Sequence, residues 1–345
     1  MATKGYHHYR GKGRGSKKLL VLLLLLILIG ALTFLFLQRY MVYDSDGGVH
    51  LELPFGKDGK DDQADTIPDD EIHIEREESP TPQPEPEPEP LALTPLHAKE
   101  LSYNCLNSDP SGALKGQEAV VVNIKRSDGA ITYRTAIDLP QSVSRGSKAT
   151  STHLQTITGS NCYTVARIAA LCDQSYPIAQ SAAAFTYPGG SLWRDNYSRL
   201  WLDPTAEETA SYLCDLAKEC AQLGFDEILL DYMRFPIEGN LSQTTLGDTK
   251  RPDAMAALTE KIREAVGPEV AVSILLPASL DTTSAFKASG LTAQVLTERF
   301  DRIYVPQDSA AYAWLDGALD KAFDRSARLV LTSYAATEGS YMITQ

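Results

Sequence analysis

The stretch GFDEILLDYMRFP, residues 224–236, ends an apolar run on side chains that could do chemistry. Asp231 and Arg234 stand at the end of that run, and Pro236 then breaks it. A carboxylate in this position is a candidate general acid, general base or stabiliser of positive charge. The structural alternative is an ion pair between Asp231 and Arg234 that closes the following loop. Both interpretations require an element that brings the end of this run to a surface.

Residues 91–345 supply such elements, because short β-branched runs alternate there with helical stretches. This pattern predicts a parallel sheet whose strands are buried on both faces. The length of the segment, 345 − 90 = 255 residues, is typical of an α/β (β/α)8 TIM-like barrel. We expect strands at 91–96, 119–125, 163–171, 227–233, 270–276, 302–306, 328–334 and 341–344. The last two are joined by too few residues for a helix, so the barrel is expected to close imperfectly, or to remain an open doubly wound sheet.

In a parallel barrel, functional side chains lie where strands end and the next loops begin. Asp231 would then reach the functional face from the fourth strand, followed by Tyr232 and Arg234 as ligand-binding candidates. Asp226 and Glu227 stand at the start of the same strand, at the opposite face, and are predicted to be structural.

The segment from Trp193 to Pro236 resembles the signature of a bacterial family of glycoside hydrolase-like TIM barrels, whose central motif is GFDEI-x-x-DY-x-RFP. Strands at 119–125 and 163–171 also resemble the family, so the likeness spans most of 91–345. It implies a glycoside hydrolase barrel. Two departures place the usual catalytic set in question: Asn123 replaces an Asp, and VPQDSAAY at 305–312 replaces PM-x-YPSHY.

Glycoside hydrolysis ordinarily requires two carboxyl groups on either side of the bond that is cleaved. Asp231 is one candidate, and Asp308, which follows the strand expected at 302–306, is the best placed second one. Asp173 and Glu238 are held in reserve. Asp308 is equally suited to cap the helix that follows it.

Ligand-binding candidates lie in the loop-rich stretch before the motif and at an early strand end. Trp193, Tyr197 and Trp201 offer flat faces that suit the C–H surface of a sugar, with packing in the core as the alternative. Lys125 could contact an anionic sugar or pair with Asp231, and a solvated lysine is the alternative.

The run Leu19–Leu37 has no charged residue and, as a helix, would be about 28 Å long, close to the thickness of a bilayer core. Six basic residues precede it in 1–18, and only Arg39 follows soon after. This asymmetry predicts a cytoplasmic tail at 1–18 and a single-pass anchor with the C-terminal part outside. A long, cleaved signal peptide is the alternative.

Residues 38–90 are predicted to be a disordered spacer. The part from 44 to 90 holds 16 acidic residues against three basic ones, and its end alternates Pro with Glu. Such a sequence favours an extended, semi-rigid chain. The basic block lies beside the membrane segment, so nothing indicates a nucleic-acid partner.

No His/Cys pair has metal-ligand spacing, and no Gly-rich phosphate loop is present, so we expect neither a metal nor a cofactor. The five cysteines are odd in number and scattered, which favours free thiols. Together these patterns predict a membrane-anchored, surface-exposed glycoside hydrolase that acts on a cell-envelope or environmental polysaccharide. A non-catalytic carbohydrate-binding barrel and a structural envelope scaffold are the alternatives.

Overall fold

The computed structural model describes residues 41–43, 49–51 and 91–344. Within the segment predicted as spacer, β1 (Met41–Tyr43) and β2 (Val49–Leu51) pair as a two-stranded antiparallel sheet. The predicted membrane segment, Leu19–Leu37, lies outside the described residues. In the part of the chain that the structure describes, no helix is both long and apolar enough to cross a bilayer.

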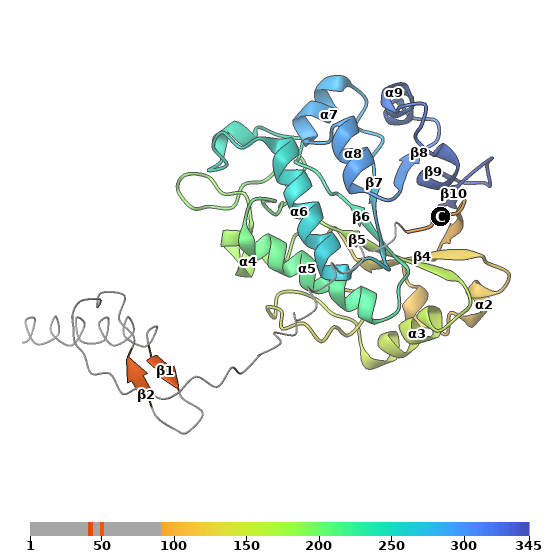
Figure 1. Ribbon diagram of the computed structural model, residues 1–345, viewed down its shortest axis with the longest axis horizontal. Helices are drawn as coiled ribbons and strands as arrows, with labels where there is room; N and C mark the ends of the chain where they lie inside the picture. Colours follow the sequence, from red (N-terminus) through yellow and green to blue (C-terminus); the bar gives the residue numbers. More distant parts are fainter. Residues whose placement is uncertain (1–40, 44–48, 52–90, 345) are drawn as a thin grey trace, which may run out of the picture. The chain divides into compact units, whose positions relative to one another are not determined.

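Residues from 97 onward form a closed barrel of eight parallel strands (Figure 1). In chain order the strands are β3 (His97–Glu100), β4 (Ala119–Lys125), β5 (Tyr163–Ala169), β6 (Glu227–Asp231), β7 (Ala271–Leu275), β8 (Ile303–Pro306), β9 (Leu329–Ser333) and β10 (Tyr341–Ile343). Each pairs with the next, and β10 also pairs with β3. The TIM-like barrel is thus confirmed, and β6 is its fourth strand as predicted.

The expectation of imperfect closure is wrong. No helix stands between β9 and β10, as their short separation indicated, but the connecting residues 334–340 are sufficient to return the chain for parallel pairing. Residue pairs such as Tyr341–Leu331 on one side and Tyr341–His97 on the other complete the ring.

Helices cover the outside of the barrel (Figure 1). They are α3 (Lys148–Thr158), α5 (Glu207–Gln222), α6 (Arg251–Val266), α7 (Thr283–Ser289), α8 (Ala293–Arg299), α9 (Ala310–Ala318) and α10 (Arg325–Arg328), with short turns α2 (Ser111–Leu114) and α4 (Tyr176–Ala179) and the 3-10 turns η1 (Cys105–Asn107), η2 (Ser181–Ala183) and η3 (Leu241–Gln243). The longest two, α5 and α6, lie side by side. The apolar stripe of α5, which includes Leu213, Leu216 and Cys220, is buried against the barrel.

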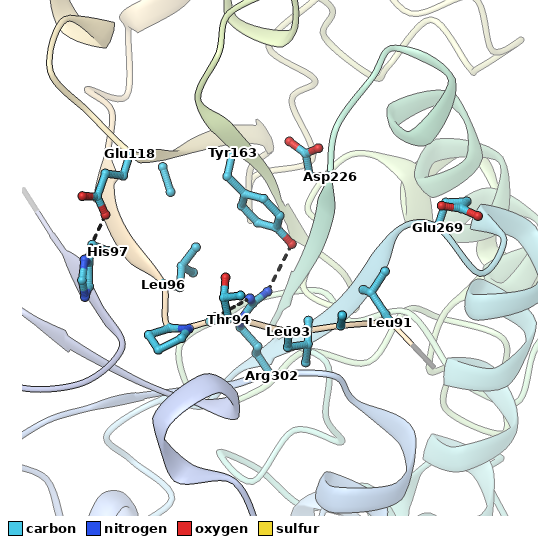
Figure 2. A pocket seen from close by; sticks show the side chains of 13 residues that line it. Leu91, Leu93, Thr94, Leu96, His97, Glu118, Tyr163, Asp226, Glu269 and Arg302 are labelled. Atoms are coloured by element: carbon cyan, nitrogen blue, oxygen red, sulfur yellow. Dashed lines mark hydrogen bonds and ion pairs between the residues drawn. The ribbon is translucent and has the colours of Figure 1, made fainter. Parts of the chain in front are cut away.

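The strand expected at 91–96 is not formed. Pro95 has no N–H for a strand ladder, and this segment instead crosses the amino-terminal end of the barrel. There the carbonyl of Thr94 accepts a hydrogen bond from Arg302 at 3.1 Å. Figure 2 shows this segment beside Tyr163 and Arg302, where it encloses a pocket of about 310 Å³. The first strand, β3, begins only at His97.

The amino-terminal end of the barrel interior is closed by a buried polar network. The carboxylate of Glu227 accepts hydrogen bonds from Arg302 at 2.6 Å, from Tyr304 at 2.8 Å and from Tyr163 at 3.1 Å. Asp226 accepts hydrogen bonds from the backbone N and hydroxyl of Thr164. Both acidic residues are therefore structural, as predicted.

Candidate functional site

Two adjoining cavities open at the carboxyl-terminal ends of the strands. The larger, about 380 Å³, is lined by Arg167, Arg199, Asp231, Tyr232, Arg234 and Glu238 and by residues at or just after the ends of β7 to β10. We call it the main cleft. The smaller, about 210 Å³, shares Arg167, Asp231 and Tyr232 with it and extends to Glu100 and Asn123. Polar side chains thus gather at the end of the barrel where function was predicted.

Asp231 ends β6, and its partner is Arg167 of β5. Oδ2 of Asp231 accepts hydrogen bonds from Nη2 of Arg167 at 2.7 Å and from Nε at 3.2 Å, while Oδ1 accepts one from the backbone N of Tyr232 at 2.8 Å. The proposed structural pair of Asp231 with Arg234 is not formed.

Arg167 also donates from Nη1 to Oε1 of Glu100 at 2.6 Å, and Nδ2 of Asn123 donates to the same oxygen at 3.0 Å. Burial acts to lower the pKa of Arg167, but the charges of Asp231 and Glu100 outweigh it and the pKa is raised. One guanidinium therefore holds two carboxylates at the mouth of the barrel.

Glu238, a reserve candidate, is the second carboxylate in the main cleft. Both Nη atoms of Arg234 donate hydrogen bonds to its carboxylate, Nη2 to Oε1 at 2.8 Å and Nη1 to Oε2 at 3.1 Å. Nη2 of Arg199 lies 3.5 Å from the same Oε2. Burial acts to raise the pKa of Glu238, but the hydrogen bonds and charge of Arg234 prevail and the pKa is lowered. Arg234, predicted to bind ligand, is itself buried and serves to hold this carboxylate.

The structure does not bring Asp308 into the main cleft with Asp231. Asp308 is exposed in the turn after β8 and is not among the residues that line the cleft. It does not cap α9 either, because the hydroxyl of Ser309 accepts the hydrogen bond from the backbone N of Tyr312. Asp173, the other reserve, is fully buried away from the cleft.

Lys125 does not pair with Asp231 and is not a solvated lysine. Its side chain is buried, with Nζ 3.0 Å from Oδ2 of Asp173 and 2.5 Å from the carbonyl oxygen of Ala169. Lys125 lines the smaller cavity and not the main cleft, so its contact with an anionic sugar stays a prediction. The pair ties the end of β4 to the loop after β5 instead.

Trp193 and Trp201 are 2 % and 0 % exposed, so the expectation that they stack on a sugar does not match their positions. Trp193 packs edge-on against Phe185. Trp201 lies behind the main cleft, with its ring 5.8 Å from that of Tyr232 and its Nε1 donating to Asp195 at 2.9 Å. Trp201 therefore packs behind residues that line the main cleft.

Tyr232 remains a candidate for contact with a ligand. It lines both cavities, is half-buried, and has a backbone φ of +52°, a conformation that costs energy for a residue with a Cβ. This φ turns the chain sharply after Asp231 and places the Tyr232 ring between the cavities and Trp201. Strain of this kind is frequent at functional sites.

Arg167, Glu100 and Arg199 were missed as site residues in the sequence. Arg167 did carry a signal, because it is the only charged residue in the run YTVARIAAL and a buried charge requires a partner. Among the described residues, no group of three or more His, Cys, Asp or Glu side chains is placed to hold a metal ion. All five cysteines are free thiols, as the sequence favoured.

Comparisons with known proteins bear on the same region. Solved structures similar to this chain include a hypothetical protein from Ruminiclostridium thermocellum, with 26% identity, coverage of 51% of this chain and 95% of its own, and a TM-score of 0.44. An α-galactosidase from Thermus thermophilus has 15% identity, coverage of 66% and 46%, and a TM-score of 0.42. The glycoside hydrolase domain of PelA from Pseudomonas aeruginosa has 14% identity, coverage of 72% and 86%, and a TM-score of 0.42.

The comparison with curated proteins found no match. A family model does match, over residues 114–282, and its description is "Putative glycosyl hydrolase domain". This range contains β4 to β7, the motif at 224–236, and Asp231 with Glu238. The resemblance predicted from the motif is confirmed: residues 114–282 are similar to the domain that this family model describes, and the match supports the predicted enzyme class.

Proposed function

We propose that the barrel hydrolyses O-glycosidic bonds of a polysaccharide in the main cleft. The observation that carries this proposal is that two carboxylates, Asp231 and Glu238, line one cleft at the carboxyl-terminal ends of the strands. Two carboxyl groups are what the reaction ordinarily needs, one to protonate the leaving oxygen and one to act as base or nucleophile. The second carboxylate is thus Glu238 in place of Asp308.

The surroundings of Glu238 indicate which of the two acids has which role. The lowered pKa of Glu238 keeps it ionised at neutral pH, which suits a base or nucleophile. Asp231 is then the proton donor to the glycosidic oxygen. The bond between the anomeric carbon and the glycosidic oxygen breaks, that oxygen leaves as an alcohol with the proton of the acid, and water adds to the anomeric carbon and gives its own proton to a carboxylate of the site.

The remaining walls of the cleft suit a sugar chain. Leu275, Leu276, Pro277 and Pro306 give an apolar side, and hydroxyl groups of Ser279, Thr332 and Thr344 lie among them. Sugars present C–H patches beside hydroxyl groups, so a mixed wall of this kind can contact both. Tyr232 contributes a half-buried ring.

The proposed reaction is tested with the full-length chain, purified in detergent, on a panel of cell-wall and plant polysaccharides. Released reducing ends and retained binding are measured together for the native chain, Asp231→Asn and Glu238→Gln, with the exposed Asp308→Asn as a matched control. We expect each cleft variant to lose about 10²- to 10⁴-fold in rate with binding kept, and the control to retain its rate. Binding without release in every form would instead indicate a carbohydrate-binding barrel. Absence of both binding and release would favour a structural scaffold.

We further propose that the barrel is displayed outside the cell on a single membrane anchor. The support is the apolar run Leu19–Leu37, the basic tail before it, and the acidic, Pro-rich residues 38–90 that can act as a spacer. The substrate would then be a polysaccharide of the cell envelope or the environment. Protease added to intact cells should remove the barrel from the membrane fraction, and recovery of the intact chain in a soluble fraction would contradict the anchor.

A further inference from the structure

One arginine of the main cleft, Arg199, is held in place by the loop that carries it. Asp195 accepts hydrogen bonds from Nε of Arg199 at 2.7 Å, from the backbone N atoms of Tyr197 and Arg199 at 2.9 Å each, and from Nε1 of Trp201 at 2.9 Å. The backbone makes a tight turn in which Ser198 has a φ of +63°. The position of Arg199 is therefore fixed before any ligand arrives.

Aromatic rings further restrict this guanidinium. Its central carbon lies 5.1 Å from the ring centre of Tyr197 and 5.4 Å from that of Trp201. Trp201 is buried, whereas Tyr197 is 71% exposed. An aromatic ring thus stands in solvent beside the guanidinium of Arg199, where it can contact a bound ring.

The Nη atoms of Arg199 donate no hydrogen bond to the described residues, unlike those of the other two arginines that line the cleft. Arg167 uses all three nitrogens on Asp231 and Glu100, and both Nη atoms of Arg234 are hydrogen-bonded. Nη2 of Arg199 is buried without a hydrogen-bond partner in the described part of the chain and lies 3.5 Å from Oε2 of Glu238, so Nη1, which makes no hydrogen bond to the described residues, is the atom available to a ligand. A guanidinium that is held by Nε and has Nη1 unpaired can donate a charge-assisted hydrogen bond to a carboxylate or phosphate.

The charges around the cleft allow such a group. Of the carboxylates near it, Asp231 and Glu100 are held by Arg167, Glu238 is held by Arg234, and Asp195, the counter-ion of Arg199, is buried behind the lining. Both oxygens of Glu238 are engaged by Arg234. An anion at Arg199 would therefore displace no existing hydrogen bond.

We propose that the cleft takes an anionic saccharide, whose carboxylate or phosphate is bound by Arg199 on the side of the cleft where the exposed Tyr197 stands. This inference rests on the proposed function and names its substrate class. Arg199 then determines specificity, while Asp231 and Glu238 carry out the reaction. A uronate and a phosphorylated sugar share the required chemistry, and they are separated by the probes below.

The test measures dissociation constants of the full-length chain for two matched pairs. Trigalacturonate is compared with its methyl ester, and glucose 6-phosphate with glucose, so that each pair differs mainly in charge. We expect one charged probe to bind at least about 10-fold more tightly than its neutral counterpart, the scale of a charge-assisted hydrogen bond, and the preference to weaken with added salt. The pair that shows the preference identifies the anion.

Arg199→Gln should abolish the preference and leave binding of the neutral probe nearly unchanged. Arg194→Gln is the matched control, because Arg194 lies in the same loop, is exposed, and does not line the cleft. If Arg199→Gln does not fold, Arg199→Lys keeps the charge without the planar fork and should retain part of the preference.

Equal affinities within both pairs, absence of binding to all four probes, or an equal loss for charged and neutral probes in Arg199→Gln would overturn the inference. The proposed function can survive that outcome. If the chain still releases reducing ends from a neutral polysaccharide and Asp231→Asn abolishes this release, the hydrolase stands and only the anionic substrate class fails. If no polysaccharide is cut, both fail.

Discussion

Replacement of Glu227 by Gln should destabilise the barrel and leave the chemistry of the cleft intact. Glu227 is fully buried at the amino-terminal end of the barrel and is the counter-ion of Arg302, which is nearly as deeply buried. Burial acts to lower the pKa of Arg302, but the charge of Glu227 outweighs it and the pKa is raised. In the variant the guanidinium stays charged and loses its counter-ion inside the protein.

The size of the effect follows from this burial. Loss of one partner from a buried ion pair costs about 3–5 kcal/mol, because the remaining charge is left uncompensated. Lys261 and Glu207 form a pair of the same length, 2.6 Å, on the surface of α5 and α6, where both side chains are well exposed. Glu207→Gln should therefore leave the free energy of unfolding almost unchanged.

Urea unfolding followed by tryptophan fluorescence measures both variants against the native chain. We expect a lower midpoint for Glu227→Gln with an unchanged slope, and recovery of most of the loss in the double variant Glu227→Leu/Arg302→Met. Equal, small changes for Glu227→Gln and Glu207→Gln would refute the reasoning. So would a Glu227→Gln chain of native stability that no longer cuts or binds saccharide.

Two further predictions concern the loops behind the cleft. Burial acts to raise the pKa of Asp195, but the hydrogen bonds it accepts lower it, so its stabilising contribution is present above the ordinary aspartate pKa and is lost as pH falls through the lowered value. Asp195→Asn should flatten the fall in unfolding free energy below about pH 4, and an unchanged acid profile would contradict this. At Gly239, with a φ of +151°, a Cβ would lie 2.7 Å from a ring carbon of Trp193. Gly239→Ala should therefore lower the free energy of unfolding, measured by thermal unfolding, by about 1–3 kcal/mol. Gly189→Ala is the control and should lower it much less, because no atom lies within 4 Å of its added Cβ. Equal losses in the two variants would contradict this prediction.

Most of the fold was predictable because buried parallel strands are apolar on both faces. The strands expected from 119 to 344 agree with β4 to β10 within two residues at each end. The first strand was misplaced because apolar residues at 91–96 cross the end of the barrel, whereas β3 reads HAKE and has Ala98 as its single apolar residue. Closure was missed because the sequence shows no helix between β9 and β10, and pairing with β3 depends on strands distant in sequence.

The site was less predictable, because its partners are set by tertiary geometry. Asp231 and Tyr232 stand where strand-end reasoning put them. Glu238 follows Arg234 by four residues in a loop, and only the fold shows that their ion pair lines the same cleft as Asp231. Asp308 follows its strand just as closely, but the turn after β8 leaves it exposed and outside the cleft lining.

The most direct test of the central claim compares Asp231→Asn with Asp308→Asn on the first polysaccharide that the native chain is found to cut. Both changes remove one carboxylate at a strand end, and only the first removes one from the main cleft. The account predicts loss of reducing-end release in Asp231→Asn with saccharide binding retained, and native release in Asp308→Asn. Native release in Asp231→Asn, or its loss in Asp308→Asn alone, would contradict the account.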